Sequence, residues 1–174
     1  MERRISQTTL QAQLSALIMV PFIVGAWIAA YVLYGVEFFD GRDNVWTILA
    51  CIAMLATIIP HELLHAAGWM LAAGKTKEEM KISIKLPFGA SIRFYGKMRV
   101  SEFLVGAMFP FVFTSAIPAA VGIMTGNFYC LMYGTMLAMT CGSDIFLCIK
   151  AWKYRDCDCY DPGITGIVVE GVEA

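Results

Sequence analysis

Charged residues are scarce in this sequence. Of its 174 residues, 16% are charged and 59% are hydrophobic, and the mean hydropathy is +0.66. A soluble domain has about 25% charged residues, so the composition excludes an ordinary soluble domain and predicts a membrane protein. The net charge of −1 and the pI of about 6.1 indicate no basic surface, and we therefore expect no nucleic-acid partner.

The sequence also lacks the signals of a zinc ribbon, of a second domain and of a cleavable signal peptide. Cys157 and Cys159 form a C-x-C without a second pair, which does not indicate a zinc ribbon. No repeat or change of composition divides the chain, so we expect one membrane-embedded domain over residues 1–174. The first apolar run is too long for a signal peptide, and we expect it to remain as a membrane helix. Residues 153–174, rich in aspartate and glycine, are expected to be irregular.

Long uncharged runs predict the membrane helices. No charged residue lies within residues 5–36 or 103–143, and a span needs about 20 apolar residues. The second run is too long for one span and is interrupted by glycine and asparagine at residues 126–127. Pro60 is expected to bend one helix. We predict an all-α polytopic membrane protein with four transmembrane helices, at residues 14–34, 45–73, 102–124 and 128–152.

The longest polar stretch lies between the second and third predicted helices. Within it, apolar residues alternate with lysine and serine from Met80 to Leu86, and a turn containing Pro87 and Gly89 follows. A period of two around such a turn indicates a β-hairpin. We therefore expect a short hairpin at residues 81–96, with one apolar and one cationic face.

The lysines and arginines predict the orientation of these helices. Twelve of the 13 lie before the first helix, between the second and third, or at the end of the fourth and beyond. Only Arg42 lies between the first and second helices, and the connection between the third and fourth has none. Because cytoplasmic segments carry the excess of positive charge, we expect both termini and the hairpin to be cytoplasmic.

The chain has only two histidines, and both belong to one pattern, H-E-x-x-H at residues 61–65. On a helix, His61 and His65 project from the same face, where their neutral ring nitrogens can bind one Zn²⁺. Glu62 lies about 100° around the helix, where it can accept a proton from water that attacks a carbonyl. Ionisable groups are costly to bury in an apolar helix, so we expect a zinc site rather than a chance match.

A catalytic zinc usually has three protein ligands, and no third histidine exists. Asp144 is one candidate, because it lies 16 residues into its predicted helix, as His61 does in its own. At 1.5 Å per residue, both lie about 24 Å from the outer surface. Glu102, near the cytoplasmic end of the third predicted helix, is the competing candidate, and the residue pattern leaves both open.

The pattern resembles a known class of enzymes. His61, Glu62 and His65 on a membrane helix, with Asp144 on a later helix, are similar to the site-2 protease class of intramembrane zinc metalloproteases. The length and the four expected spans resemble the small bacterial membrane proteins described as putative zincin peptidases. The resemblance covers residues 45–150 and implies His61, His65 and Asp144 as zinc ligands and Glu62 as general base. It departs from the site-2 pattern at Ile145, where that class usually has glycine.

Three functions are compatible with these residues. The sequence favours zinc-dependent hydrolysis of peptide bonds at or within the bacterial cytoplasmic membrane, with a membrane protein or a peptide as substrate. The second is a non-catalytic membrane protein in which zinc supports stability or the binding of a partner. The third, a metal transporter, is less favoured because the loops lack accessory histidines and acidic clusters. The hairpin either offers a sheet edge to an extended substrate or is a simple surface hairpin at the membrane interface.

Overall fold

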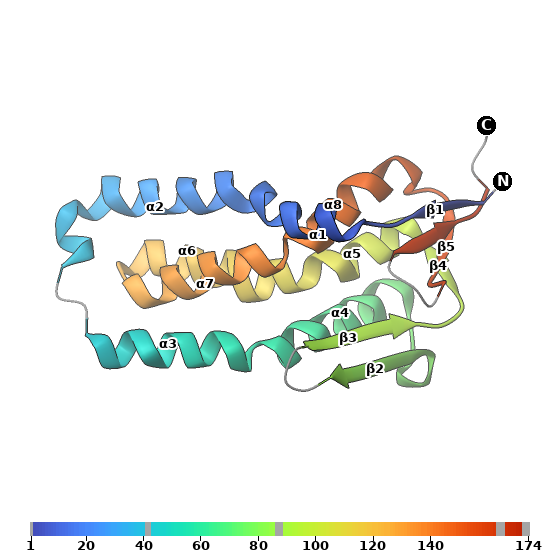
Figure 1. Cartoon of the computed structure of the whole chain (residues 1–174), viewed down its shortest axis with the longest axis horizontal. Coiled ribbons are helices and arrows are strands. Elements are labelled where there is room, and N and C mark those ends of the chain that lie inside the picture. The colour runs from blue at the N-terminus through green and yellow to red at the C-terminus, as the bar shows by residue number, and fades with distance from the viewer. Residues whose placement is uncertain (1, 41–42, 86–88, 163–165, 172–174) are drawn as a thin grey trace.

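Helices run along the length of the molecule, and its small sheets lie together at one end (Figure 1). The computed structural model describes residues 2–40, 43–85, 89–162 and 166–171. The helices are α1 (Thr9–Leu14), α2 (Val20–Tyr34), α3 (Asn44–Ala56), α4 (Ile58–Ala73), α5 (Val100–Pro110), α6 (Ile117–Thr125), α7 (Phe128–Thr140) and α8 (Gly142–Ala151). The strands are β1 (Arg3–Ile5), β2 (Met80–Lys85), β3 (Gly89–Phe94), β4 (Lys97–Arg99), β5 (Asp158–Tyr160) and β6 (Ile167–Val169).

Two continuous helical segments are long and apolar enough to cross a membrane, Leu10–Tyr34 and Val100–Thr125. They contain the first and third predicted helices almost residue for residue. The second of them passes through a π-helical turn, Phe111–Ala116, directly after Pro110. Proline cannot donate the usual backbone hydrogen bond, and the wider turn accommodates it without ending the helix.

The other two predicted helices, at residues 45–73 and 128–152, are each broken. The bend expected from Pro60 is found in the first, whereas the break in the second corrects the expectation of one continuous helix. The axes of α3 and α4 differ by 46°, and those of α7 and α8 by 51°. The first break is at Thr57, three residues before Pro60. Pro60 has no N–H to donate to the carbonyl of Ala56, and its ring clashes with that carbonyl, so the helix breaks there. If each bent pair is one span, the structure has up to four segments that could cross a membrane by length and composition.

The expected hairpin is confirmed. Strands β2 and β3 pair antiparallel, with Lys81 opposite Arg93 and Ile82 opposite Ile92. Its turn, at residues 86–88, lies outside the described residues. The buried side chain of Phe94 contacts Trp69 of α4, with ring centroids 5.3 Å apart. This contact attaches the hairpin to the helix that carries both histidines.

The prediction of an irregular C-terminal region is wrong. Strands β5 and β6 form an antiparallel sheet with β1 and β4 in the order β1-β6-β5-β4. Cys159 is fully buried in it, and burial raises the pKa of its thiol to about 12.

Two apolar clusters stabilise the ends of the bundle. The larger lies where α4, α5 and α8 meet the sheets, and contains Trp69, Phe94, Phe103 and Ile167. The smaller lies among α2, α6 and α7 at the opposite end. The larger cluster holds α4 and α8 at fixed positions relative to each other, and these helices carry the predicted site residues.

An ion pair closes the base of the hairpin. The buried Nζ of Lys75 donates to Oε1 of Glu79 at 2.9 Å and to the carbonyl of Tyr95 at 2.8 Å. The amide of Thr76 donates to the other oxygen of Glu79. These donors, the Thr76 amide first and then Lys75, lower the pKa of Glu79 below its ordinary 4.5. The ion pair therefore stabilises the hairpin above pH 4.5, and this contribution is lost as the pH falls through the lowered pKa.

We predict that the hairpin loosens in acid because of Glu79. The Tyr95 amide donates to the Glu79 carbonyl. Its protection against hydrogen exchange, measured relative to the intrinsic rate at each pH, should fall below about pH 4.5 in the parent, as the carboxylate gains a proton. The Glu79→Gln variant should exchange faster at neutral pH and lose most of this dependence on pH. Glu78→Gln, at the adjacent exposed acid, is the matched control, and equal behaviour of the two variants would contradict the role of Glu79.

Candidate metal centre

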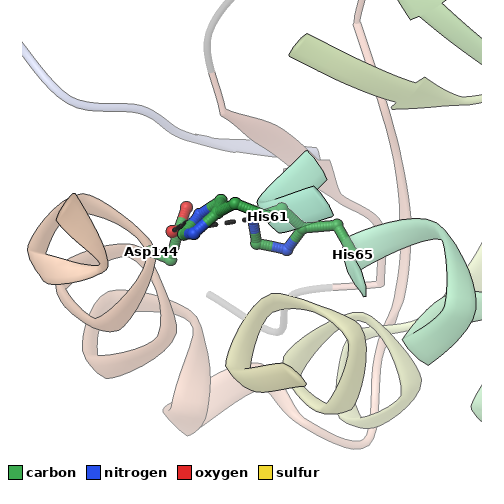
Figure 2. Close-up of side chains that lie close together, drawn as sticks. All are labelled: His61, His65 and Asp144. Atoms are coloured by element: carbon green, nitrogen blue, oxygen red, sulfur yellow. Dashed lines mark ion pairs between the residues drawn. The ribbon is translucent and has the colours of Figure 1, made fainter. Parts of the chain in front are cut away.

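The candidate centre is formed where α4 and α8 come together just after their breaks. His61, Glu62 and His65 lie on α4, and the amide of His61 donates to the carbonyl of Thr57 at 2.8 Å. Asp144 lies in the first turn of α8. Figure 2 shows the Asp144 carboxylate directed at the two imidazoles from the opposite helix. The breaks thus turn both helices so that their predicted ligands face each other.

The distances between these groups suit a zinc ion. One carboxylate oxygen of Asp144, Oδ2, lies 3.5 Å from Nε2 of His61 and 3.6 Å from Nε2 of His65. One ligand atom from each residue lies within 4.8 Å of the others. Tetrahedral zinc with bonds of about 2.0–2.1 Å separates its ligand atoms by about 3.4 Å. Two imidazoles and a carboxylate are also a ligand set that zinc accepts, so the residues fit the ion.

A backbone contact orients His65. Its Nδ1 lies 3.0 Å from the carbonyl oxygen of Gly106 on α5. A carbonyl can only accept, so Nδ1 carries the proton, and the lone pair of a neutral ring is then on Nε2, which faces Asp144. Histidines that bind metals commonly donate their other ring nitrogen to such a partner. The contact therefore prepares His65 to bind a metal through Nε2.

Two glycines allow this contact by bringing α4 and α5 together. A Cβ at Gly68 would lie 2.6 Å from the Cα of Gly106, and a Cβ at Gly106 would lie 2.1 Å from the ring of Trp69. The Trp69 ring stacks on His65 with centroids 5.8 Å apart, and its Nε1 donates to the carbonyl of Phe103. The crossing of the helices therefore fixes His65 from two sides, through a hydrogen bond and a stacked ring.

Glu62 lies beside the three clustered residues and is directed toward the hairpin. Its Oε2 accepts from the amide of Ile92 on β3 at 2.9 Å. Its side chain lines a cavity of about 240 Å³ together with His65, Asp144, Trp69 and Ile92. A catalytic zinc site needs an open position for water or substrate. The cavity supplies that space with a carboxylate at its wall.

The structure brings together four of the five residues considered from the sequence. His61, His65 and Asp144 form the group that could hold a metal ion among the described residues, and Glu62 lies next to it. Glu102 is elsewhere, at the start of α5, where its Oε2 accepts from the amide of Arg99 at 2.8 Å. Binding of a metal by His61, His65 and Asp144 stays a prediction.

Sequence reasoning missed the groups that support these side chains. The Gly106 carbonyl, the Ile92 amide and the Trp69 ring each contact a site residue. The small residues after His65 do predict close approach of another helix. Nothing local in the sequence identifies which carbonyl or amide then meets the site.

A histidine pair with a nearby carboxylate, a second acid beside them and an adjoining cavity are the groups expected of a metallopeptidase-like centre. The chain belongs to the family described as "Putative zincin peptidase", whose profile matches residues 54–159. The matched region contains all four site residues and the hairpin. No curated protein and no solved structure matches the chain. Membership of this family supports zinc-dependent peptidase activity.

We predict that zinc affinity depends on Asp144 and not on Glu102. Asp144→Asn should lower the affinity by more than about 100-fold, because losing a ligand costs more than losing an outer contact of one. Glu102→Gln should bind zinc as the parent does, because Glu102 accepts a hydrogen bond at a helix start. Zinc titration against a competing chelator measures both, and the reverse ranking would move the third ligand to Glu102.

Gly106→Ala tests the crossing of α4 and α5. The new Cβ cannot coexist with the Trp69 ring, so α5 must shift and the hydrogen bond to His65 must lengthen. Zinc affinity should fall by about 10–100-fold, with a lower thermal midpoint. Gly25→Ala on α2 is the control, because its Cβ would meet nothing within 4 Å, and it should stabilise slightly or not at all. Equal zinc affinities in the two variants would show that the Gly106 carbonyl has no part in the site.

Proposed function

We propose that the protein is an integral-membrane zinc metallopeptidase of the site-2 protease type, which hydrolyses peptide bonds at or within a bacterial cytoplasmic membrane. The observation that carries the proposal is the meeting of Asp144 with both histidines of an H-E-x-x-H sequence. His61, His65 and Asp144 would hold the zinc. The family match supports the peptidase class, and the apolar helices support the membrane.

Bound zinc would polarise the scissile carbonyl and lower the pKa of the attacking water. Residues of the chain supply the proton transfer and the exclusion of water. Glu62 takes the proton of the water at its carboxylate and passes it to the leaving amine. The Ile92 amide holds one oxygen of that carboxylate, so the other is left to face the cavity. The buried Trp69 ring excludes water from the side of His65.

The edge of β3 offers a place for an extended substrate. The Ile92 amide donates to Glu62 and therefore points away from β2, since one N–H cannot serve both directions. An extended peptide that adds to this edge would form backbone hydrogen bonds with β3 and bring its own carbonyls past Glu62. This arrangement suits peptide hydrolysis, because a helical substrate keeps its peptide groups in internal hydrogen bonds.

We also propose that each bent pair of helices is one span. With the two continuous helices this gives four spans, and it leaves β1, β6 and the hairpin on one side, since they lie at the same end (Figure 1). That end carries twelve of the 13 lysines and arginines in the sequence. The excess of positive charge favours the cytoplasm for this end and for both termini.

The test compares the purified parent with Glu62→Gln in proteoliposomes that contain a membrane-inserted peptide. We predict that Glu62→Gln retains zinc and loses about 10²–10⁴-fold in cleavage rate, as expected for removal of a general base. His61→Ala and His65→Ala should lose zinc as well. Zinc content by mass spectrometry and cleavage by peptide sequencing are the measurements.

The same samples separate the alternatives. Unchanged cleavage in Glu62→Gln would remove Glu62 as the base. Zinc bound tightly without cleavage in any sample would favour the non-catalytic protein, and zinc flux into the vesicles would favour the transporter. Zinc content that His61→Ala and His65→Ala do not change would place the metal elsewhere.

A further inference from the structure

An apolar groove lies along the outer side of α5. Its volume is about 440 Å³, and its second wall is formed by residues that directly follow α8. The apolar lining residues of α5 and of the π-helical turn after it are Leu104, Val105, Met108, Phe109 and Val112. Phe103 and Ala107 of α5 line the cavity at the metal centre instead, so the groove and that cavity lie on different sides of the same helix.

The length of the groove matches one leaflet of a membrane. From Ser101 to Val112, its first and last lining residues on this helix, the rise is about 16 Å at 1.5 Å per residue. The hydrocarbon core of a membrane is about 30 Å thick, so one leaflet contributes about 15 Å. Ser101 lies at the start of the apolar segment Val100–Thr125. In the proposed span the groove therefore extends from the membrane surface to about the middle of the bilayer.

The polar lining residues of the groove lie together at its surface end. The amide of Ser101 donates to the carbonyl of Arg155 at 3.1 Å, so these two residues are adjacent. The guanidinium carbon of Arg155 lies 5.6 Å from the centroid of the Trp152 ring. Its Nε is 3.7 Å from a carboxylate oxygen of Asp156, whose side chain is 91% exposed. Such an exposed pair is weak, and a guanidinium has five N–H donors, so Arg155 is able to bind a phosphate as well.

The surroundings of this end favour an anionic headgroup. In the proposed orientation it faces the cytoplasm, where membranes carry their anionic lipids. Ser101 lies in the first turn of α5, where the amides give a helix a partial positive charge. The acid in the same turn, Glu102, accepts from the Arg99 amide as a helix cap. Trp152 is 60% exposed, and tryptophan is typical of the headgroup level of a membrane.

We propose that this groove binds one anionic phospholipid, with its phosphate at Arg155 and the Ser101 hydroxyl and one acyl chain along α5 as far as Val112. The proposal rests on the proposed function, through the membrane position of α5. Charge and length together select the occupant. A transmembrane helix of a partner would continue across the whole bilayer, whereas the groove ends near the middle and has a cation at its surface end.

A lipid in this groove joins two elements that support the metal centre. The wall on α5 belongs to the helix whose Gly106 carbonyl contacts His65. The other wall continues from α8, which carries Asp144. A ligand that binds the folded protein stabilises it, so the lipid is expected to hold α5 and α8 in the arrangement that brings His65 and Asp144 together.

The first test measures the preference for an anionic headgroup. The purified protein in detergent is titrated with phosphatidylglycerol or with phosphatidylcholine of the same acyl chains, and native mass spectrometry measures the bound lipid. The first phosphatidylglycerol should bind at least about fivefold more tightly in the parent. Arg155→Gln should lose most of this preference, because the charge-assisted contact with the phosphate is removed.

Lys153→Gln is the matched control for Arg155→Gln. It removes the same charge two residues away, and the Lys153 Nζ lies over the ring of Tyr154, 4.7 Å from its centroid, rather than among the groove residues. This variant should keep the preference for phosphatidylglycerol. Equal affinity of the parent for the two lipids, or an equal loss of preference in the two variants, would overturn the headgroup site.

The second test fills the groove. Val105 and Val121 are 46% and 42% exposed, but Val105 lines the groove and Val121, on α6, does not. Added phosphatidylglycerol should raise the thermal midpoint of the parent and of Val121→Trp by a few degrees, because it binds the folded state. It should have little effect on Val105→Trp. An equal rise in both variants would overturn the acyl-chain position, and a dimer that Val105→Trp alone prevents would make a second copy the occupant.

The lipid site and the peptidase fail in different ways. A preference for phosphatidylglycerol that depends on Arg155, in a protein that cleaves no peptide, would retain the lipid site and remove the peptidase. Cleavage that depends on Glu62, in a protein without preference between the two lipids, would retain the peptidase and remove the lipid site. Zinc content and the thermal midpoint without added lipid verify that each variant is folded.

Discussion

The close crossing of α4 and α5 at Gly68 and Gly106 is the constraint on which the metal centre depends. Neither position has room for a Cβ, and only at this separation does the Gly106 carbonyl reach His65. That hydrogen bond selects the ring nitrogen that faces Asp144. Helix packing through small residues therefore determines which ring nitrogen of His65, one turn from Gly68, is available to a metal.

The two helix breaks complement this crossing. The bends of 46° between α3 and α4 and of 51° between α7 and α8 turn α4 and α8 toward each other. Without these bends, the predicted ligands on the two helices would lie farther apart. The first bend has its cause in Pro60. At the second, Gly142 lets the start of α8 pass close to the N-terminal segment, because a Cβ there would lie 2.6 Å from the carbonyl oxygen of Ser15.

The sequence predicted those parts of the fold that have local patterns. The uncharged runs gave the helices to within a few residues, and the period of two gave the hairpin. The positions of the helix breaks were harder to predict, because Pro60 indicates a bend but not that the bend lies at Thr57. The second sheet was missed since β1, β4, β5 and β6 have three residues each, too few for a periodic signal.

The candidate site was predicted from the spacing of its residues along the chain, and hydrophobic periodicity contributed little. The interval from His61 to His65 places both rings on one face, and equal counts along two helices bring Asp144 to the same depth. The distinction between Asp144 and Glu102 needed the structure, because both lie near the ends of apolar runs. The hydrogen bonds of Glu62 with Ile92 and of His65 with Gly106 could not be predicted, because each joins residues at least 30 positions apart.

The sheet that pairs β1 with β6 has a consequence for biosynthesis. Arg3, Arg4 and Ile5 pair with residues 167–169, and nearby Gln7 donates to the carbonyl of Ser143, next to Asp144. β1 pairs with a strand near the other end of the chain, so it has no partner until residues 167–169 have been synthesised. The segment beside Asp144 therefore reaches its final position only once both ends of the chain are present.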